Sequence, residues 1–397
     1  MLWLAFKMLL GDTTKWLGVV LGVFLCTFLV THLLSMFSGM MARSYALVSD
    51  IPIADVWVMD PAVEYADEPA GLPDTALSRV RSVDGVAWAT PLFTRSLRAR
   101  LISGAFRSVL VVGVDDATLV GAPSELAGGR LSDLRRADAV IVDEGSAATL
   151  LRVPLRPPAP GPGWRQPELR AVARALTPGD ELLINDRRVV VVGLARLAAR
   201  FLAKPVVYTT YSRAVSLAPV ERGALSFVLV HAREGQDPAE LAARIERVTG
   251  LKSRTRGAFS DETYGYYVRM TGVVDRIVFM IGIGIVVGVS VSALLLYLFT
   301  SENLPLYATL NALGMTHGTL VRMVIVQAMI AGVTGYGLGV GASALFATLL
   351  HVSAMPFRPT TWNLGLTAVT VVGVAGFSSA LSAARLARLE PGLAFRR

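Results

Sequence analysis

Four long apolar runs dominate the hydropathy pattern of the chain. They lie at about residues 16–37, 277–299, 323–350 and 364–384. A helix needs about 20 consecutive apolar residues to cross the hydrocarbon core of a bilayer, and each run is long enough. The pattern therefore predicts four membrane-spanning helices, with one large segment inserted between the first and the second.

The first run has an alternative interpretation as a cleavable signal peptide, because Lys7 and Lys15 precede it. A signal peptide has an apolar core of about 7–15 residues, and this run is longer. The length favours a membrane anchor that is retained in the protein.

The inserted segment, residues 42–272, has the pattern of a water-facing domain with both helices and strands. Short β-rich runs indicate strands at 86–90, 108–114, 138–144, 187–194 and 226–232, and NDRR at 185–188 indicates a hairpin turn. Helices are predicted at 73–83 and 237–250. In the second helix Asp237 is the expected N-cap, Glu240 completes a capping box and Gly250 ends the helix. Each helix precedes a strand, which suggests two small α/β units.

These patterns predict a membrane α-helical fold with an inserted α+β extracytoplasmic domain. The expected parts are an N-terminal segment with the first span (1–41), the outer domain (42–272), the second span (273–300), a cytoplasmic loop (301–322), the third span (323–350), a short outer loop (351–363), the fourth span (364–384) and a C-terminal tail (385–397).

Basic residues near the spans indicate the orientation of the chain. The N-terminal segment carries Lys7 and Lys15, and the tail carries Arg385, Arg388, Arg396 and Arg397, whereas the loop between the last two spans carries only Arg358. Short loops rich in Lys and Arg stay in the cytoplasm, while long domains cross the membrane largely regardless of charge. We therefore expect a multi-pass protein of the bacterial inner membrane with both termini in the cytoplasm.

Composition agrees with a membrane protein and narrows the chemistry. The chain is 53% hydrophobic and carries a formal net charge of +8, but its basic residues form no pattern typical of nucleic-acid binding, so membrane lipid is the expected anionic partner. Cys26 is the single cysteine and the four histidines are far apart in sequence, so neither a disulfide nor a metal site is expected.

Catalytic motifs are absent from the sequence. There is no nucleophile elbow and no phosphate-binding loop of the Walker type. The adjacent carboxylates Asp115–Asp116 and Asp143–Glu144 are interpreted as solvated surface. A Pro/Gly-rich stretch at 156–167 is either an interaction loop or a tolerated insertion. We expect no enzyme activity, no catalytic residue and no cofactor on this chain.

Glycines recur four residues apart in the spans, a spacing that lets helix backbones approach closely in lipid. The pairs are Gly18 and Gly22, Gly284 and Gly288, and Gly337 and Gly341. The polar residues His32 and Gln327 are exceptions within otherwise apolar spans, and the absence of acidic or basic residues there argues against a proton-coupled carrier or an ion channel.

The segment after the second span, SENLPLYATLNALGMTHGTLVRMVIVQ (301–327), carries a specific resemblance. Leu306, Leu310 and Leu313 recur at helical spacing beside Tyr307. Together with Glu302 and the ending Ala312-Leu313-Gly314, this motif resembles the segment that follows the second span in permeases of the FtsX/MacB superfamily of ABC transporters. LPLYATLNALG is most similar to the LPEYATLKAMG of the DevC branch, although Leu306 and Asn311 replace a Glu and a Lys. The C-terminal SALSAARLARLEPGLAFR and the order of spans resemble the same superfamily.

The resemblance implies a mechanism and a set of partners. Two copies of the permease form a homodimer, and each contacts a separate cytoplasmic ATPase that binds ATP and Mg²⁺. The residues expected to contact the ATPase are Glu302, Leu306, Tyr307, Leu310, Leu313 and Gly314. In the DevC and MacB systems the outer domain engages a periplasmic adaptor and, through it, an outer-membrane channel. Export of a hydrophobic or lipid-like substrate is the expected function.

Three alternatives stay open from the sequence. The chain could be a transducer like FtsX, which regulates a cell-wall hydrolase, or a lipoprotein-release permease with the same order of spans. A membrane-anchored enzyme or sensor is the third, and it is disfavoured because no catalytic motif is present and four spans exceed what an anchor needs.

Overall fold

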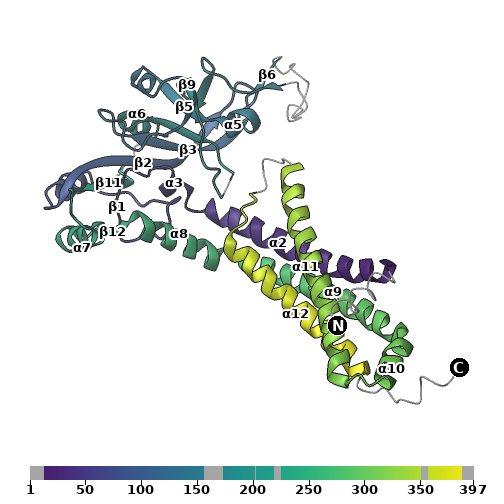
Figure 1. The fold of residues 1–397 in the computed structure, drawn as a ribbon. Helices are drawn as coiled ribbons and strands as arrows, with labels where there is room; N and C mark the ends of the chain where they lie inside the picture. The colour runs from purple at the N-terminus through teal and green to yellow at the C-terminus, as the bar shows by residue number, and fades with distance from the viewer. Residues whose placement is uncertain (1–12, 156–172, 202, 219–224, 350–355, 387–397) are drawn as a thin grey trace. The chain divides into compact units, whose positions relative to one another are not determined.

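The computed structural model describes residues 13–155, 173–201, 203–218, 225–349 and 356–386 (Figure 1). The chain forms two compact units, one of Met1–Met40 with Thr271–Arg397 and one of Met41–Met270. We call them the helical unit and the outer domain. The Pro/Gly-rich stretch at 156–167 lies outside the described residues, as do Lys7 and the tail from residue 387.

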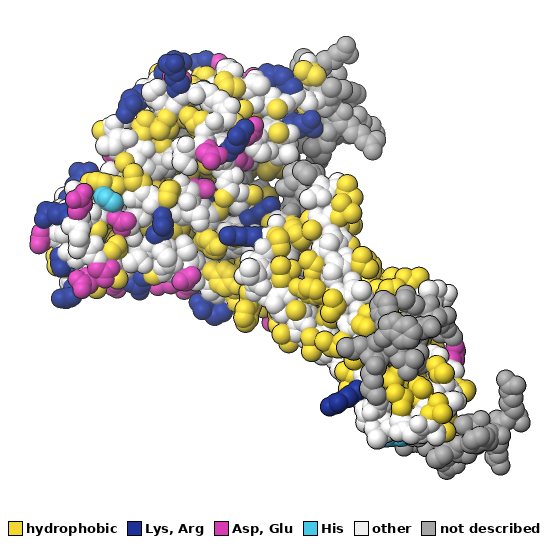
Figure 2. All heavy atoms as spheres, viewed as in Figure 1, with side chains coloured by type: hydrophobic (Ala, Val, Ile, Leu, Met, Phe, Trp, Pro, Cys, Tyr) yellow, Lys and Arg dark blue, Asp and Glu magenta, His cyan; other side chains and the backbone are white. Residues whose placement is uncertain are grey.

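The helical unit contains α2 (Thr13–Ala42), α9 (Val273–Glu302), α11 (His317–Leu349) and α12 (Thr361–Leu386). Each is long and apolar enough to cross a membrane, which confirms the four predicted spans. In Figure 2 this unit is largely covered by hydrophobic side chains, whereas acidic and basic side chains gather on the outer domain. The helices extend beyond the apolar runs because backbone hydrogen bonds continue into the flanking polar residues.

Glycines bring the membrane helices close together. A Cβ added to Gly288 of α9 would overlap Cys26 of α2, and one added to Gly22 would lie 2.8 Å from the Ser292 hydroxyl. Cβ atoms at Gly18 and Gly284 would meet Leu295 and Leu29 at ordinary contact distance. These four glycines therefore lie where α2 and α9 face each other.

The third predicted pair does not lie against another described helix of this chain. Cβ atoms added to Gly337 and Gly341 would meet no described atom within 4 Å, whereas at Gly335 and Gly339 they would lie 2.8 Å from Val23 and 2.6 Å from Thr27. A shift of two residues turns a position by about 200° around a helix. The run GVTGYGLGVG contains both pairs, and their spacing alone does not identify the face that meets α2.

The outer domain contains a sheet whose first four strands run in the order β12-β1-β11-β2, all antiparallel. These strands and two helices follow the chain order β1 (Val56–Met59), α4 (Thr75–Arg81), β2 (Val86–Arg100), β11 (Phe227–Ala232), α7 (Pro238–Thr249) and β12 (Lys252–Thr255). This is a split β-α-β arrangement repeated once. The two predicted α/β units are therefore not separate, because both helices pack on one face of a single sheet.

The long segment between β2 and β11 extends the same sheet. The further strands follow in the order β3 (Phe106–Val114), β10 (Val206–Thr210), β5 (Ala139–Asp143), β9 (Arg187–Ala195) and β4 (Leu126–Gly128), and β8 (Glu181–Ile184) pairs with β2 and β9. Short helices η1 (Leu131–Arg135), α5 (Glu144–Thr149) and α6 (Tyr211–Leu217), and a two-stranded sheet of β6 (Val153–Pro154) and β7 (Ala173–Arg174), complete it. The predicted hairpin turn is confirmed, since Asn185 and Asp186 have φ of 47° and 60° between β8 and β9.

Strand β11 shows how the sheet builds its cores. Val228 and Val230 point into the core beneath α4 and α7, while Phe227 and Leu229 point into a second core on the other face. Successive side chains of a strand alternate between faces, so a continuous apolar run fits a strand that is covered on both sides. A third core lies among β3, β5, β9, α5 and α6.

The adjacent carboxylates lie at the surface, where Asp143 and Asp116 also have hydrogen-bond partners. Asp143 accepts hydrogen bonds from the backbone N–H and the hydroxyl of Ser146 at 2.8 and 2.7 Å, and so caps α5. Asp116 accepts one from the Ser212 hydroxyl at 2.7 Å. These residues organise turns beside the sheet.

Candidate coupling site

The predicted contact segment folds into a short helix directly after α9. This helix, α10 (Leu304–Ala312), has Pro305 in its first turn, where the missing N–H costs nothing. Asn303 joins the two helices, because its side-chain amide donates to the Phe299 carbonyl of α9 at 2.8 Å and its backbone carbonyl accepts from the Tyr307 N–H of α10 at 3.1 Å. Gly314 ends the segment at φ 94°, in the left-handed region that favours glycine, and the next helix, α11, begins at His317.

One face of α10 is anchored in the helical unit by Tyr307. Its ring is fully buried with Leu296 of α9 and Leu320 of α11. Its hydroxyl donates to the side-chain oxygen of Gln327 at 3.1 Å, and Gln327 is itself fully buried. A buried polar group needs a partner, so this bond fixes the position of α10 on α11. The polar exception Gln327 in the third span is thereby explained.

The opposite face of α10 is open. Leu306 is 44% exposed and Leu313 is 78% exposed, and Glu302 and Gly314 are exposed as well. Leu310 is half-buried and packs against the core around Tyr307. The six predicted contact residues therefore separate into four on the surface, one at the boundary and one, Tyr307, that positions the helix from inside.

A second helix precedes α9. Helix α8 (Arg256–Met270) belongs to the outer domain, and Thr271 and Gly272 separate it from α9. Gly272 has a φ of 59°, which glycine adopts without strain. The same membrane helix thus has a short helix at each end, α8 in the outer domain and α10 in the helical unit.

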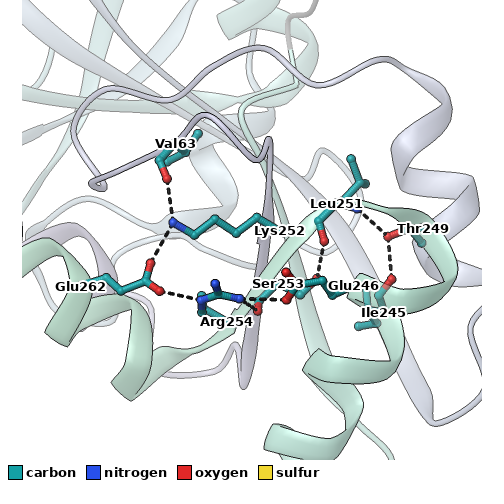
Figure 3. Close-up of polar contacts among 9 residues, drawn as sticks. All are labelled: Val63, Ile245, Glu246, Thr249, Leu251, Lys252, Ser253, Arg254 and Glu262. Atoms are coloured by element: carbon teal, nitrogen blue, oxygen red, sulfur yellow. Dashed lines mark hydrogen bonds and ion pairs between the residues drawn. The ribbon is translucent and has the colours of Figure 1, made fainter.

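Ion pairs fasten α8 to strand β12 (Figure 3). Glu262 accepts from Lys252 at 2.8 Å and from Arg254 at 2.6 Å. Lys252 also donates to the Val63 carbonyl at 2.8 Å, and Arg254 to Glu246 of α7 at 2.8 Å. The network joins α8 to the edge strand, to α7 and to the loop after β1.

The electrostatics of this network favour the charged carboxylate. Partial burial of Glu262 raises its pKa, but the hydrogen bonds and charges of Lys252 and Arg254 outweigh burial and leave the pKa below its ordinary value. The same bonds raise the pKa of Arg254. Both charges are therefore maintained at neutral pH, and α8 stays attached.

Aromatic contacts hold α8 along its length. Phe259 is fully buried against Trp57 of β1 and Phe227 of β11, with ring centroids 5.7 and 5.8 Å away. Near the end of the helix, Tyr266 stacks on Tyr65 at 4.1 Å. The helix is thus attached to the outer domain by both apolar and polar contacts.

Sequence reasoning did not identify α8 as a functional element. Residues 256–270 alternate apolar and polar positions without a clear helical stripe, and the helix buries only Phe259, Thr263 and Tyr267. The signal that could have identified it is the spacing of these three residues, which recur every four positions.

The side chains that could bind a metal ion or form a disulfide are not grouped together in the described part of the chain. No group of three or more His, Cys, Asp or Glu side chains there could hold a metal ion. Cys26 is buried in the helical unit. His231 pairs with Asp55 at 2.6 Å and stacks on Trp88, and His32 packs beside Phe28 and Phe346.

Two protein families match the chain and together span most of it. Residues 17–248, more than half of the chain, match the family described as MacB-like periplasmic core domain, and residues 278–391 match that described as FtsX-like permease C-terminal. No curated protein matches the chain.

Several solved structures resemble part of it. The extracellular domain of the noncanonic ABC-type transporter YknZ from Gram-positive bacteria is 14% identical, covers 51% of this chain and 98% of its own, and has a TM-score of 0.32. The periplasmic region of MacB from Actinobacillus actinomycetemcomitans is 13% identical and covers 54% and 94%, with a TM-score of 0.36. A domain of a putative permease protein from Porphyromonas gingivalis is 14% identical and covers 52% and 90%, at 0.31.

Proposed function

Because this chain belongs to the FtsX/MacB family of ABC-type permeases, we propose that it transmits the ATP-driven movement of a separate cytoplasmic ATPase to its own outer domain. The family is a membrane transporter component, and the chain is a multi-pass membrane protein with an extracytoplasmic α+β domain. In this proposal both termini and α10 lie in the cytoplasm, and two copies of the chain form a homodimer.

The exposed face of α10 is the observation that carries the proposal. Leu306 and Leu313 are exposed apolar side chains of a segment that Tyr307 and Gln327 fix to the helical unit. An exposed apolar surface on a rigid element is typical of a protein contact. We infer that the ATPase binds this face, and that Glu302 and Gly314 lie in the same interface.

The route across the membrane follows the chain. Helix α10 is joined to the cytoplasmic end of α9 by Asn303, and α8 is joined to its outer end by Thr271 and Gly272. A displacement of α10 by the ATPase would move α9 along or about its axis, and α8 would carry that displacement into the outer domain. This order of contacts suits mechanical transmission, and ATP and Mg²⁺ would be bound by the partner alone.

Export through an adaptor is the specific function that we favour. The family match over residues 17–248 is to a MacB-like periplasmic core, and this supports an exporter of a hydrophobic or lipid-like substrate that works with a periplasmic adaptor and an outer-membrane channel. The amino-acid sequence of α10 with the two residues after it, LPLYATLNALG, supports assignment to the DevC branch. A transducer like FtsX, which regulates a cell-wall hydrolase, would use the same α8–α9–α10 route.

The proposal is tested by placing charges on the open face of α10. Leu306→Asp with Leu313→Asp adds two carboxylates to an apolar interface, and burying each without a partner is costly. We expect the double variant to lose co-purification with the ATPase while the helical unit stays folded, since neither side chain is buried. Val248→Asp, at a position of the outer domain that is 63% exposed, is the matched control. Unchanged ATPase association in the double variant would refute the proposed interface.

A further inference from the structure

The segment between β9 and β10 contacts the two stretches of the outer domain that connect it to the membrane helices α2 and α9. We call residues 43–50, which follow α2, the first connector, and residues 262–272, which precede α9, the second connector. The first connector contains the short helix α3 (Ala46–Ser49), which ends at Asp50. Adjacent residues of the 196–205 segment, Arg200 and Phe201, contact one connector each.

Arg200 binds the first connector. Its guanidinium lies 2.9 Å from the Asp50 carboxylate, and both side chains are nearly buried, at 4% and 11% exposed. The backbone N–H of Ala198 also donates to Asp50 at 3.4 Å. An ion pair that is shielded from water in this way is weakly screened by salt, and loss of either partner leaves a buried charge without compensation.

Phe201 binds the second connector. Its ring lies 4.4 Å from that of Tyr267, which is one turn before the end of α8. The Tyr267 hydroxyl donates to Asp67 at 2.8 Å, so Tyr267 is held from two sides. Burial and the neighbouring Asp67 raise the pKa of Tyr267 and keep it protonated as a donor.

The charge of Arg200 acts on Asp50 of the first connector and on Asp67, the partner of Tyr267. Burial raises the pKa of Asp67, and the positive charges of Arg200 and Lys204 oppose that rise. Burial raises the pKa of Asp50 as well, and Arg200 again opposes it. In the described residues the Nε and Nη1 atoms of Arg200 have no hydrogen-bond partner. The charge of Arg200 thus acts on the Asp50 carboxylate, which it contacts, and on the Asp67 carboxylate, which accepts from Tyr267.

We propose that Arg200 and Phe201, with their partners Asp50 and Tyr267, form a clasp that couples the two connectors so that a movement of either is passed to the other. Replacement of a buried ion pair by apolar residues is often neutral or stabilising, so stability alone gives little reason for Arg200 at this position. A role in fixing the relative position of two segments does give a reason for a buried ion pair there. The proposal rests on the transmission function above, and it adds that α2 and α9 transmit together.

The test uses the full chain in detergent micelles, without any ATPase, and measures hydrogen–deuterium exchange in both connectors. Asp50→Asn alters only the first connector, and Phe201→Leu alters only the contact to the second. If the clasp couples them, each variant raises exchange about tenfold in both residues 43–50 and residues 262–270. Arg200→Met raises exchange in both, while Arg247→Met, at an exposed position of α7, changes neither.

Two outcomes would overturn the clasp. Exchange that rises only in the connector each variant touches would mean that the two contacts act independently. Unchanged exchange in both would mean that neither contact matters. Strand β11 reports global folding, and if Arg200→Met or Asp50→Asn raises exchange there, the Phe201→Leu variant decides, because it leaves no buried charge unpaired. Because no ATPase is present, failure of ATPase binding at α10 leaves this result unaffected, and failure of the clasp leaves the α10 interface intact.

Discussion

Helices α8 and α10 lie at the two ends of the same membrane helix, and they are held in place by different kinds of contact. Helix α8 is fastened in water by ion pairs at Glu262 and by aromatic stacking. Helix α10 is held by apolar packing around Tyr307 and by the buried hydrogen bond from the Tyr307 hydroxyl to Gln327. Each form of attachment suits its surroundings. Exposed ion pairs contribute measurably to stability where several charges form a network. A hydrogen bond is strongest where water is excluded.

This difference predicts how strongly a single substitution should weaken the attachment of the helix at each end of α9. The buried contacts of α10 centre on Tyr307, with Leu310 at the edge of the same core, so substitution of Tyr307 should release most of the helix. The attachment of α8 is distributed over several contacts, so single substitutions should weaken it only in part. The predictions below test this contrast, from the largest expected effect to the smallest.

Tyr307→Ala should have the largest effect. It removes a fully buried aromatic ring and the hydrogen bond of that ring to Gln327, and truncation of a buried aromatic side chain costs about 3–5 kcal/mol. We expect rapid hydrogen exchange throughout residues 304–312 and loss of ATPase association. Phe259→Ala in α8 is the matched comparison at the other end. If Phe259→Ala releases residues 256–270 as completely as Tyr307→Ala releases α10, the proposed contrast is wrong.

Gly335→Ala should destabilise the packing of α11 on α2. The added Cβ would lie 2.8 Å from Val23 and 3.1 Å from the backbone nitrogen of Phe24, and overpacking of this kind costs about 1–3 kcal/mol. Gly337→Ala, two residues later, has open space in the described structure and should be neutral or stabilise the helix by about 0.5–1 kcal/mol. Unfolding of the full chain in an SDS titration measures both. Equal effects at the two positions would contradict the assigned face.

These comparisons also show which features the sequence predicts and which it does not. The four spans, the helix capped by Asp237 and the turn at Asn185–Asp186 depend on local signals, and all are present. The N-cap bond runs from the Ala239 N–H to Asp237 at 3.1 Å. Apolar run length, caps and turn residues act within a few positions, so they are readable without the fold.

Features that depend on distant partners were not predictable. Strand β2 continues to Arg100, because its second half pairs with β3 and β8 rather than with β11. The inward position of Tyr307 depends on Gln327, which is twenty positions away in the chain. The choice between the two glycine pairs of α11 depends on α2. In each case the deciding contact comes from another element of the fold.

Glu262→Gln should weaken the attachment of α8 by about 1–2 kcal/mol at neutral pH, because two charge-assisted hydrogen bonds become neutral while partial exposure reduces their strength. The folded-state pKa of Glu262 lies below its ordinary value of 4.5, so the stabilisation is complete above that value and is lost as the pH falls through the folded pKa. Wild type and variant should therefore differ at pH 7 and converge in acid. Urea unfolding of the outer domain, followed by hydrogen exchange in residues 256–270 of the full chain, measures the difference. A gap that persists unchanged at low pH would contradict the role of the charge.

Tyr307→Phe should have the smallest effect, and it separates packing from hydrogen bonding at α10. The ring is retained, so the loss is about 1 kcal/mol for the buried hydrogen bond to Gln327. Because the ring still anchors α10, we expect ATPase association to persist while exchange in residues 304–312 rises only slightly. The double variant Tyr307→Phe with Gln327→Leu, together with the two single variants, completes a mutant cycle that measures the energy of this hydrogen bond separately from the packing of the ring. If the single variant instead abolishes ATPase association, the hydroxyl and not the ring positions α10, and the attachment at this end of α9 is polar, as it is at α8.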